Sequence, residues 1–464
     1  MPRLMRCQYC GLLQDEPVGV KTCSRCGGEL DFETPPAPDQ AASYVQAQME
    51  LDQVAAPSGR NVDRYLLVTV RTPNQVPTEE TAATETGRQT LNFTAVLDVS
   101  GSMRGPKLGQ AKEAVRHALR RLHDGDVFSL VIFSSDARCI FEPAEIDDQS
   151  RRVVESALQE MQAGGMTALC GGLEMGLEKV AARKQETNLV LLLSDGQANV
   201  GETDVEMVGQ RGFEARQQGV IVSTLGVGSD YNEALMAEIA TQGGGRFYHV
   251  TDAGQISAYL TGELGEVAAL AAREMTIRLQ IPAGAALFPL SAAYPARQGA
   301  GEATVSIGDV PSGIELQVPI RLTLPAQPAG SRLSVEGALD YRSPAGNHLT
   351  TPLNRVTVRF KDHAAFDRRE GAVIPVVERV LEQMKAANVL GVSRAMAKST
   401  AEGAQRADAE LGQLREYAAL LGQERAEEEQ SKMAARFQEM KQAPAQAKAA
   451  VADAFSVQRS AKKF

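Results

Sequence analysis

The chain reads Leu91-Asn-Phe-Thr-Ala-Val-Leu-Asp98-Val-Ser-Gly-Ser102 shortly before a segment, 106–122, that has the spacing of an amphipathic helix. The apolar run 91–97 is typical of a buried strand. Asp98, Ser100 and Ser102 therefore lie on a turn at the carboxyl end of a strand, where open α/β sheets bind their ligands. A carboxylate and two hydroxyls so close together predict a hard divalent cation, Mg²⁺ before Mn²⁺ or Ca²⁺.

Further apolar runs and helical segments alternate on the carboxyl side of this turn. The nearly continuous runs indicate strands that are covered on both faces, at 127–133, 188–193 and 220–227. Helical spacing is found at 106–122, 150–161, 171–183, 204–218, 232–241 and 253–272, and a short edge strand is expected at 246–250. The alternation predicts a doubly wound, Rossmann-like α/β domain with a parallel sheet over residues 91–272.

Two more oxygen donors fall at the same edge of the predicted sheet. Thr167 lies in a glycine-rich loop that opens the helix 171–183, and Asp195 directly follows the strand 188–193. Because the carboxyl ends of parallel strands meet at one edge, we expect three loops to bring five donors together. The candidate metal residues are Asp98, Ser100, Ser102, Thr167 and Asp195.

This set of residues resembles the metal-ion-dependent adhesion site (MIDAS) of the von Willebrand factor type A (VWA) family, and the resemblance covers residues 91–272. It implies that the two serines and the threonine contact Mg²⁺, whereas the two aspartates act largely through water. It also implies that an Asp or Glu of a partner protein completes the coordination of the metal. The resemblance therefore indicates a protein-interaction scaffold and not an enzyme.

Other interpretations of the same residues are weaker. An aspartyl phosphatase needs a second aspartate two positions after the first, where this chain has Ser100. The loop 101–107 lacks the Gly-x4-Gly-Lys spacing of a phosphate-binding loop, and neither Ser100 nor Ser102 lies in a GxSxG elbow. A role in capping turns and helices fits each polar residue singly, but it does not explain five positions in register.

The N-terminal region, 1–33, carries two CxxC motifs, each followed by glycine. Four thiolates at this spacing predict a closed tetrahedral zinc site in a zinc ribbon, and the Zn²⁺ is expected to be structural because no coordination position is open. The predicted ligands are Cys7, Cys10, Cys23 and Cys26. A proline-rich linker is expected at 34–40.

The remaining regions predict a β-sandwich and a helical domain. Strand patterns in 41–90 and 273–362 are expected to join in one sandwich, and 363–464 has the stripes of a helical bundle with an alanine-rich final arm. This order resembles the inter-alpha-trypsin inhibitor heavy-chain-like proteins and the inner subunits of vesicle coats. The second resemblance leaves an alternative open: a self-assembling subunit of a coat-like or ATPase-associated assembly whose metal is structural.

Composition narrows the classes of function. The net charge of −10 argues against a general nucleic-acid-binding protein, which would be basic. No apolar run is long enough to cross a membrane, and the first residues lack the apolar core of a signal peptide. The sequence therefore predicts a soluble, cytoplasmic protein.

Overall fold

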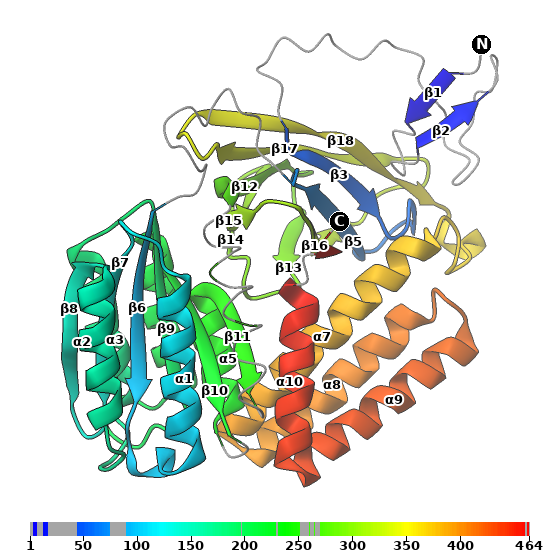
Figure 1. Cartoon of the computed structure of the whole chain (residues 1–464). Helices are drawn as coiled ribbons and strands as arrows, with labels where there is room; N and C mark the ends of the chain where they lie inside the picture. The colour runs from blue at the N-terminus through cyan, green and yellow to red at the C-terminus, as the bar shows by residue number, and fades with distance from the viewer. Residues whose placement is uncertain are drawn as a thin grey trace.

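The computed structural model describes residues 3–6, 13–16, 44–74, 90–195, 197–228, 231–250, 259, 264, 270–459 and 462–463. These residues form an α/β region, two further large sheets, a short N-terminal hairpin and a group of C-terminal helices (Figure 1). In the hairpin, β1 (Arg3–Arg6) pairs with β2 (Leu13–Glu16) in antiparallel fashion. The α/β region carries the predicted metal residues.

The α/β region is built on a sheet in the order β11-β10-β9-β6-β7-β8. Its strands are β6 (Leu91–Asp98), β7 (Val127–Phe133), β8 (Ala137–Glu145), β9 (Thr187–Ser194), β10 (Ile221–Val227) and β11 (Gly244–Val250). The predicted strands are confirmed, but the expectation of a wholly parallel sheet is wrong because β8 pairs with β7 in antiparallel fashion. The connection 134–136 is too short for the crossover that a parallel pair needs, so the chain forms a hairpin there.

Helices cover both faces of this sheet (Figure 1). Phe93, Ala95 and Leu97 of β6 belong to one core, together with α1 (Pro106–Arg121) and α2 (Asp148–Glu160). Val96 belongs to the other core, together with α3 (Leu169–Ala182), α4 (Val205–Gln217) and α5 (Glu233–Gln242). The strand therefore alternates between two buried faces, as its continuous apolar run predicts.

A small residue lets α3 lie close to the central strand. A Cβ added at Gly176 would stand 2.3 Å from Cγ2 of Val96, well inside van der Waals contact. The helix that follows the Thr167 loop is therefore held tightly against β6, and this fixes the start of the helix relative to the end of that strand.

The predicted end of the helix 253–272 is wrong. Of residues 251–269 the structure describes Tyr259 and Leu264, which are both helical, but β12 (Leu270–Gln280) begins inside the predicted helix. Leu270 and Ala272 pair with β15 (Glu302–Pro311). The alanines favour a helix locally, and strand pairing overrides that preference.

Two further sheets combine segments from before and after the α/β region. One has the order β14-β15-β12-β17-β18-β4 and the other the order β13-β16-β5-β3, and both contribute to one hydrophobic core. The early segment enters through β5, which pairs with β16 along its length. The bounds not yet given are β3 (Gln46–Leu51), β4 (Ala55–Pro57), β5 (Val62–Arg71), β13 (Ala286–Pro289), β14 (Ala296–Gln298), β16 (Ile314–Leu324), β17 (Arg332–Arg342) and β18 (His348–Lys361).

The C-terminal region is helical, as predicted. It contains α7 (Ile374–Lys398), α8 (Thr400–Ala418), α9 (Gln423–Gln442) and α10 (Pro444–Arg459), after a short 3-10 turn, η3 (His363–Ala365). A short strand, β19 (Lys462–Lys463), pairs with β16. The alanine-rich final arm is the helix α10, which packs against α7, α9 and α5 (Figure 1). Its small residues Ala447, Ala450 and Ala454 are buried and allow this close approach.

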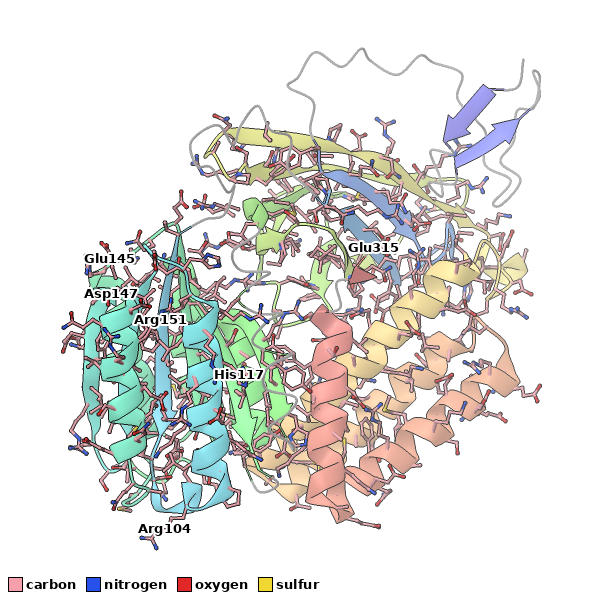
Figure 2. The ribbon with its side chains drawn as sticks, in the orientation of Figure 1. Arg104, His117, Glu145, Asp147, Arg151 and Glu315 are labelled. Atoms are coloured by element: carbon pink, nitrogen blue, oxygen red, sulfur yellow. The ribbon has the colours of Figure 1, made fainter. Side chains whose placement is uncertain are left out.

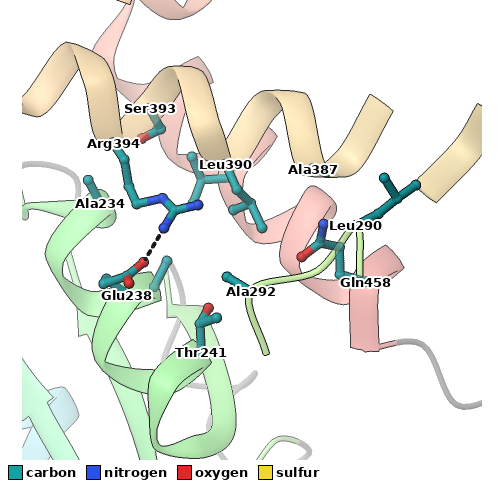
Figure 3. A pocket seen from close by; sticks show the side chains of 12 residues that line it. Ala234, Glu238, Thr241, Leu290, Ala292, Ala387, Leu390, Ser393, Arg394 and Gln458 are labelled. Carbon is teal, nitrogen blue, oxygen red and sulfur yellow. Dashed lines mark ion pairs between the residues drawn. The ribbon is translucent and has the colours of Figure 1, made fainter. Parts of the chain in front are cut away.

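The helix α5 joins the α/β region to the C-terminal helices. Figure 3 shows Arg394 of α7 pointing to Glu238 of α5, and their ion pair is 3.2 Å long. Glu238 is 6% exposed, so this carboxylate is buried in the contact. The ion pair joins α5 to α7, two helices that are far apart in the sequence, and so helps to orient α5.

Candidate metal centre

Two carboxylates lie side by side at the carboxyl ends of neighbouring strands. Asp98 is the last residue of β6, and Asp195 directly follows β9. The two strands are parallel, and their register pairs Leu97 with Leu193. Both aspartates are 0% exposed. Because a buried carboxylate is costly without compensating partners, two of them at one edge indicate a position for positive charge.

The turn after β6 places two hydroxyls beside Asp98. The backbone N–H of Ser100 donates to Asp98 Oδ1 over 2.8 Å, which fixes the turn to the carboxylate. A 3-10 turn, η2 (Gly101–Met103), follows, and the hydroxyl oxygens of Ser100 and Ser102 are 3.0 Å apart. The structure therefore brings Asp98, Ser100 and Ser102 together, as the sequence predicts.

The glycine-rich loop is bound directly to this turn. Gly101 N–H donates to the Gly165 carbonyl over 3.0 Å, and Gly164 N–H donates to the Val99 carbonyl over 2.8 Å. Gly165 has φ of +85°, and a Cβ there would stand 2.9 Å from the Ser135 hydroxyl oxygen. Glycine is needed at this position, because both the backbone conformation and the space exclude a side chain.

Thr167 connects the second loop to the third. Its N–H donates to Asn199 Oδ1 over 2.8 Å, and Asn199 N–H donates back to the Thr167 carbonyl over 3.1 Å. Thr167 is 2% exposed. The loop after β9 carries both Asp195 and Asn199, so all three loops are linked by hydrogen bonds. Asn199 was not predicted, because nothing in the sequence pairs it with Thr167.

Burial disfavours the ionised form of the Asp98 carboxyl group. It raises the pKa of Asp98 to about 6, and hydrogen bonds from Ser194 and Ser100 oppose the rise. Ser194 Oγ donates to Asp98 Oδ2 over 2.5 Å, across the pair of strands. Ser194 is a further site residue that sequence reasoning missed. A polar residue at the end of an apolar strand, beside Asp195, was the available signal.

A lysine stands beside the other carboxylate. Lys107 Nζ of α1 lies 3.2 Å from Asp195 Oδ2, and the Lys107 side chain is 18% exposed. Two carboxylates and one ammonium leave the centre with one net negative charge. A divalent cation would turn this into one net positive charge, which an external carboxylate could neutralise. Nothing in the sequence indicates that Lys107 lies beside Asp195.

The donor set fits a hard cation. The side-chain oxygens gathered here belong to carboxylate and hydroxyl groups, which are the ligands that Mg²⁺ prefers. Over the part of the chain that the structure describes, no group of three or more His, Cys, Asp or Glu side chains could hold a metal ion. Any cation held at this centre would therefore depend on the hydroxyls as well as the two carboxylates.

The predicted zinc ligands cannot be placed in the same way. Cys7, Cys10, Cys23 and Cys26 lie outside the described residues.

Among the helices that the structure describes, none is long and apolar enough to cross a membrane.

Comparison with known proteins identifies the α/β region. The model of the von Willebrand factor type A domain family matches residues 92–261. The chain is 26% identical over 246 residues to "Uncharacterized protein YfbK" of Escherichia coli, covering 51% of this chain and 42% of that protein. It is 29% identical over 173 residues to human inter-alpha-trypsin inhibitor heavy chain H3, covering 35% of this chain and 19% of that protein. The chain thus spans less than half the length of these curated relatives.

Two solved structures share the fold over most of the chain. One is described as von Willebrand factor type A from Catenulispora acidiphila (TM-score 0.58, 19% identity, 82% of this chain and 88% of that chain). The other is the ArnB paralog VWA2 from Sulfolobus acidocaldarius (TM-score 0.56, 18% identity, 90% of this chain and 99% of that chain). The family match and the order of strands and helices lead to one conclusion: residues 92–261 form a von Willebrand factor type A domain.

Proposed function

We propose that this chain is a protein-interaction scaffold that binds Mg²⁺ at its VWA domain and, through the metal, an acidic residue of a partner protein. VWA domains typically mediate protein–protein interaction. The observation that carries the proposal is the pair of buried carboxylates, Asp98 and Asp195, beside the hydroxyls of Ser100 and Ser102. Thr167 is the fifth proposed metal residue, and Mn²⁺ or Ca²⁺ could replace Mg²⁺.

The charge of the centre explains why the partner should be acidic. When bound, the metal would supply a Lewis-acidic position that accepts an oxygen ligand. Hydroxyl ligands leave the cation electrophilic, and Lys107 already offsets the charge of Asp195. A partner's Asp or Glu would then complete the coordination and neutralise the remaining positive charge. We propose binding without turnover, and therefore no enzymatic activity.

The other regions would present this site within a larger scaffold. We propose that the two additional sheets act as one β-sandwich, and that the protein is cytoplasmic. We also propose a zinc ribbon at residues 1–33 held by Cys7, Cys10, Cys23 and Cys26. The first CxxC falls between β1 and β2 in the sequence, at the connection of an antiparallel pair. One Zn²⁺ per chain by elemental analysis, lost in a Cys7→Ser, Cys10→Ser variant, would support the ribbon; a metal content near zero in the wild type would refute it.

A crosslinking pull-down tests the function. Wild type, Asp98→Ala and Asp124→Ala would be compared in Mg²⁺ and in EDTA. Asp124 is an exposed aspartate in the connection that leads into β7, so it is a matched control away from the carboxyl ends of the strands. We expect a partner that is captured by wild type and Asp124→Ala in Mg²⁺, and lost with EDTA or Asp98→Ala. Capture of the partner that is unaffected by EDTA and by Asp98→Ala would refute the proposal.

The alternative, an assembly subunit with a structural metal, makes a different prediction. Light scattering by the purified chain would then show particles larger than a monomer both with and without Mg²⁺. The scaffold proposal instead predicts no such metal-independent assembly.

A further inference from the structure

A buried lysine of α10 contacts the α/β region close to the proposed metal centre. Lys448 is 3% exposed, and its Nζ lies 3.5 Å from Glu233 Oε2 at the start of α5. The same ammonium stands 5.2 Å from the centroid of the Tyr231 ring, in the geometry of a cation–π contact. Figure 1 shows α10 beside α5 and β11. A charge buried this deeply depends on these two partners.

Tyr231 transmits this contact to the end of β10. Its ring packs on Gly226, where an added Cβ would stand 2.7 Å from the ring atoms. Its hydroxyl is 2.7 Å from His249 Nδ1. Burial and then the Lys448 charge lower the pKa of His249, so the neutral imidazole is able to accept this bond. Tyr231 is 2% exposed and has little freedom to move on its own.

Two residues next to Tyr231, Gly226 in space and Asn232 in sequence, are bonded to the strand end or loop that carries the proposed metal residues. Gly226 is paired in register with Ser194, the residue that donates to Asp98. Between Tyr231 and Glu233, the N–H of Asn232 donates to the carbonyl of Asp195 over 3.3 Å. Lys448 therefore contacts Tyr231 and Glu233, and the residue between them, Asn232, is bonded to the Asp195 loop.

Two further contacts join the C-terminal helices to α5 and β11. Glu238 of α5 pairs with Arg394 of α7, and Phe455 of α10 makes an edge-on contact with Phe247 of β11 at 6.0 Å. The C-terminal helices thus hold α5 and β11 together as one unit. Moving α10 away would break the ion pair between Lys448 and Glu233.

We propose that Lys448 couples the C-terminal helices to the metal centre, so that docking of α10 and binding of a divalent cation stabilise each other. The inference rests on the proposed function, because it requires a metal at Asp98 and Asp195. Lys448 acts here as a positioning residue, through Tyr231 and Asn232. Coupling of this kind is reciprocal: whatever factor α10 docking adds to metal affinity, the metal adds to docking.

Hydrogen exchange and metal titration together test the coupling in the full chain. Exchange protection of residues 446–458 would be measured with and without Mg²⁺, and Mg²⁺ affinity would be measured by calorimetry. The variants are Lys448→Met, which keeps the apolar stem, and Glu233→Gln, which removes the partner charge. Lys441→Met is the matched control, because Lys441 is an exposed lysine at the end of α9.

We expect Mg²⁺ to raise the protection of α10 in wild type and in Lys441→Met. Lys448→Met and Glu233→Gln should each bind Mg²⁺ about fivefold or more weakly and lose the increase in protection. If wild type binds Mg²⁺ while α10 protection and the affinity of both variants stay unchanged, the coupling is refuted and the metal site stands. If wild type binds no Mg²⁺, the proposed function fails and the coupling fails with it. Should Lys448→Met not fold, Glu233→Gln decides alone.

Discussion

Ser194 donates a 2.5 Å hydrogen bond from its Oγ to Asp98 Oδ2, and this bond joins the carboxyl ends of β9 and β6. Burial raises the pKa of Asp98 to about 6, and this hydrogen bond is the largest influence that lowers it. The bond therefore favours the ionised carboxylate that a cation needs. It also links the two strand ends that carry the proposed metal residues.

Replacing Ser194 should weaken metal binding. Ser194→Ala removes a hydrogen bond to a charged group, which is worth about 1.5–3 kcal/mol, and we expect Mg²⁺ affinity at neutral pH to fall by about tenfold or more. Ser129→Ala is the control, because Ser129 is a fully buried serine of β7 that is bonded to Thr94 instead. Equal Mg²⁺ affinities of the two variants by calorimetry would contradict the assigned role.

Crowding of the glycine loop should affect the centre more than backbone strain alone. Gly165→Ala and Gly201→Ala both force a side chain into positive φ, at +85° and +74°, which costs about 1–2 kcal/mol each. At Gly201 the added Cβ meets no described atom within 4 Å, whereas at Gly165 it meets Ser135. Because Gly165→Ala adds this clash to the strain, we expect it to lose more stability and more Mg²⁺ affinity than Gly201→Ala. A larger loss of affinity for Gly201→Ala would contradict the loop geometry.

Removing the lysine of the centre should have opposite effects with and without metal. Lys107→Met leaves Asp195 without its ammonium partner, so thermal stability should fall in EDTA. It also removes a positive charge beside the proposed cation, so Mg²⁺ should bind about tenfold more tightly. Thermal melts with and without Mg²⁺ measure both effects, and Lys441→Met should shift neither. A smaller Mg²⁺-induced rise in Tm for Lys107→Met than for wild type would contradict the charge argument.

A buried carboxyl far from the metal centre should make stability depend on pH. Burial raises the pKa of Asp52 to about 6 from 3.8, against the opposing influence of Arg64 and the Tyr65 N–H. The folded state therefore holds this proton more tightly than the unfolded state. The group's stabilising contribution is full below pH 4 and is lost as the pH rises through 6.

Asp52→Asn should remove this dependence. We expect the difference in unfolding free energy between pH 4.5 and pH 7.5 to change by about 2 kcal/mol relative to wild type, in favour of the higher pH. Denaturant unfolding at the two pH values measures it, and Asp124→Asn serves as the exposed control. An unchanged pH difference in Asp52→Asn would show that the carboxyl titrates normally.

The sequence predicted the central strands of the α/β sheet and the edge strand β11, but it missed β8 at the opposite edge and the start of β12. Continuous apolar runs located β6, β7, β9 and β10 to within a residue or two. β8 escaped because its exposure alternates and Pro143 interrupts it, which is typical of an edge strand. The early start of β12 escaped because Leu270-Ala-Ala272 favours a helix until it pairs with β15.

The sequence predicted which oxygen donors come together at the candidate centre, but it did not predict the residues that contact those donors. Asp98, Ser100 and Ser102 are close in sequence and share one turn, so their spacing alone indicates a cation site. Ser194 and Lys107 reach the carboxylates from 96 and 88 residues away, and such pairs are created only when the sheet forms. Three assignments stay predictions: the five Mg²⁺ residues, the four zinc ligands and the domain boundaries.

Calorimetric titration with Mg²⁺ tests the central claim most directly. Wild type and Asp124→Ala should each bind one Mg²⁺ per chain, and Asp98→Ala should bind none while keeping the circular dichroism of the folded protein. Absence of Mg²⁺ binding in wild type, or the same affinity in Asp98→Ala, would contradict the claim that the Asp98 turn is a metal centre.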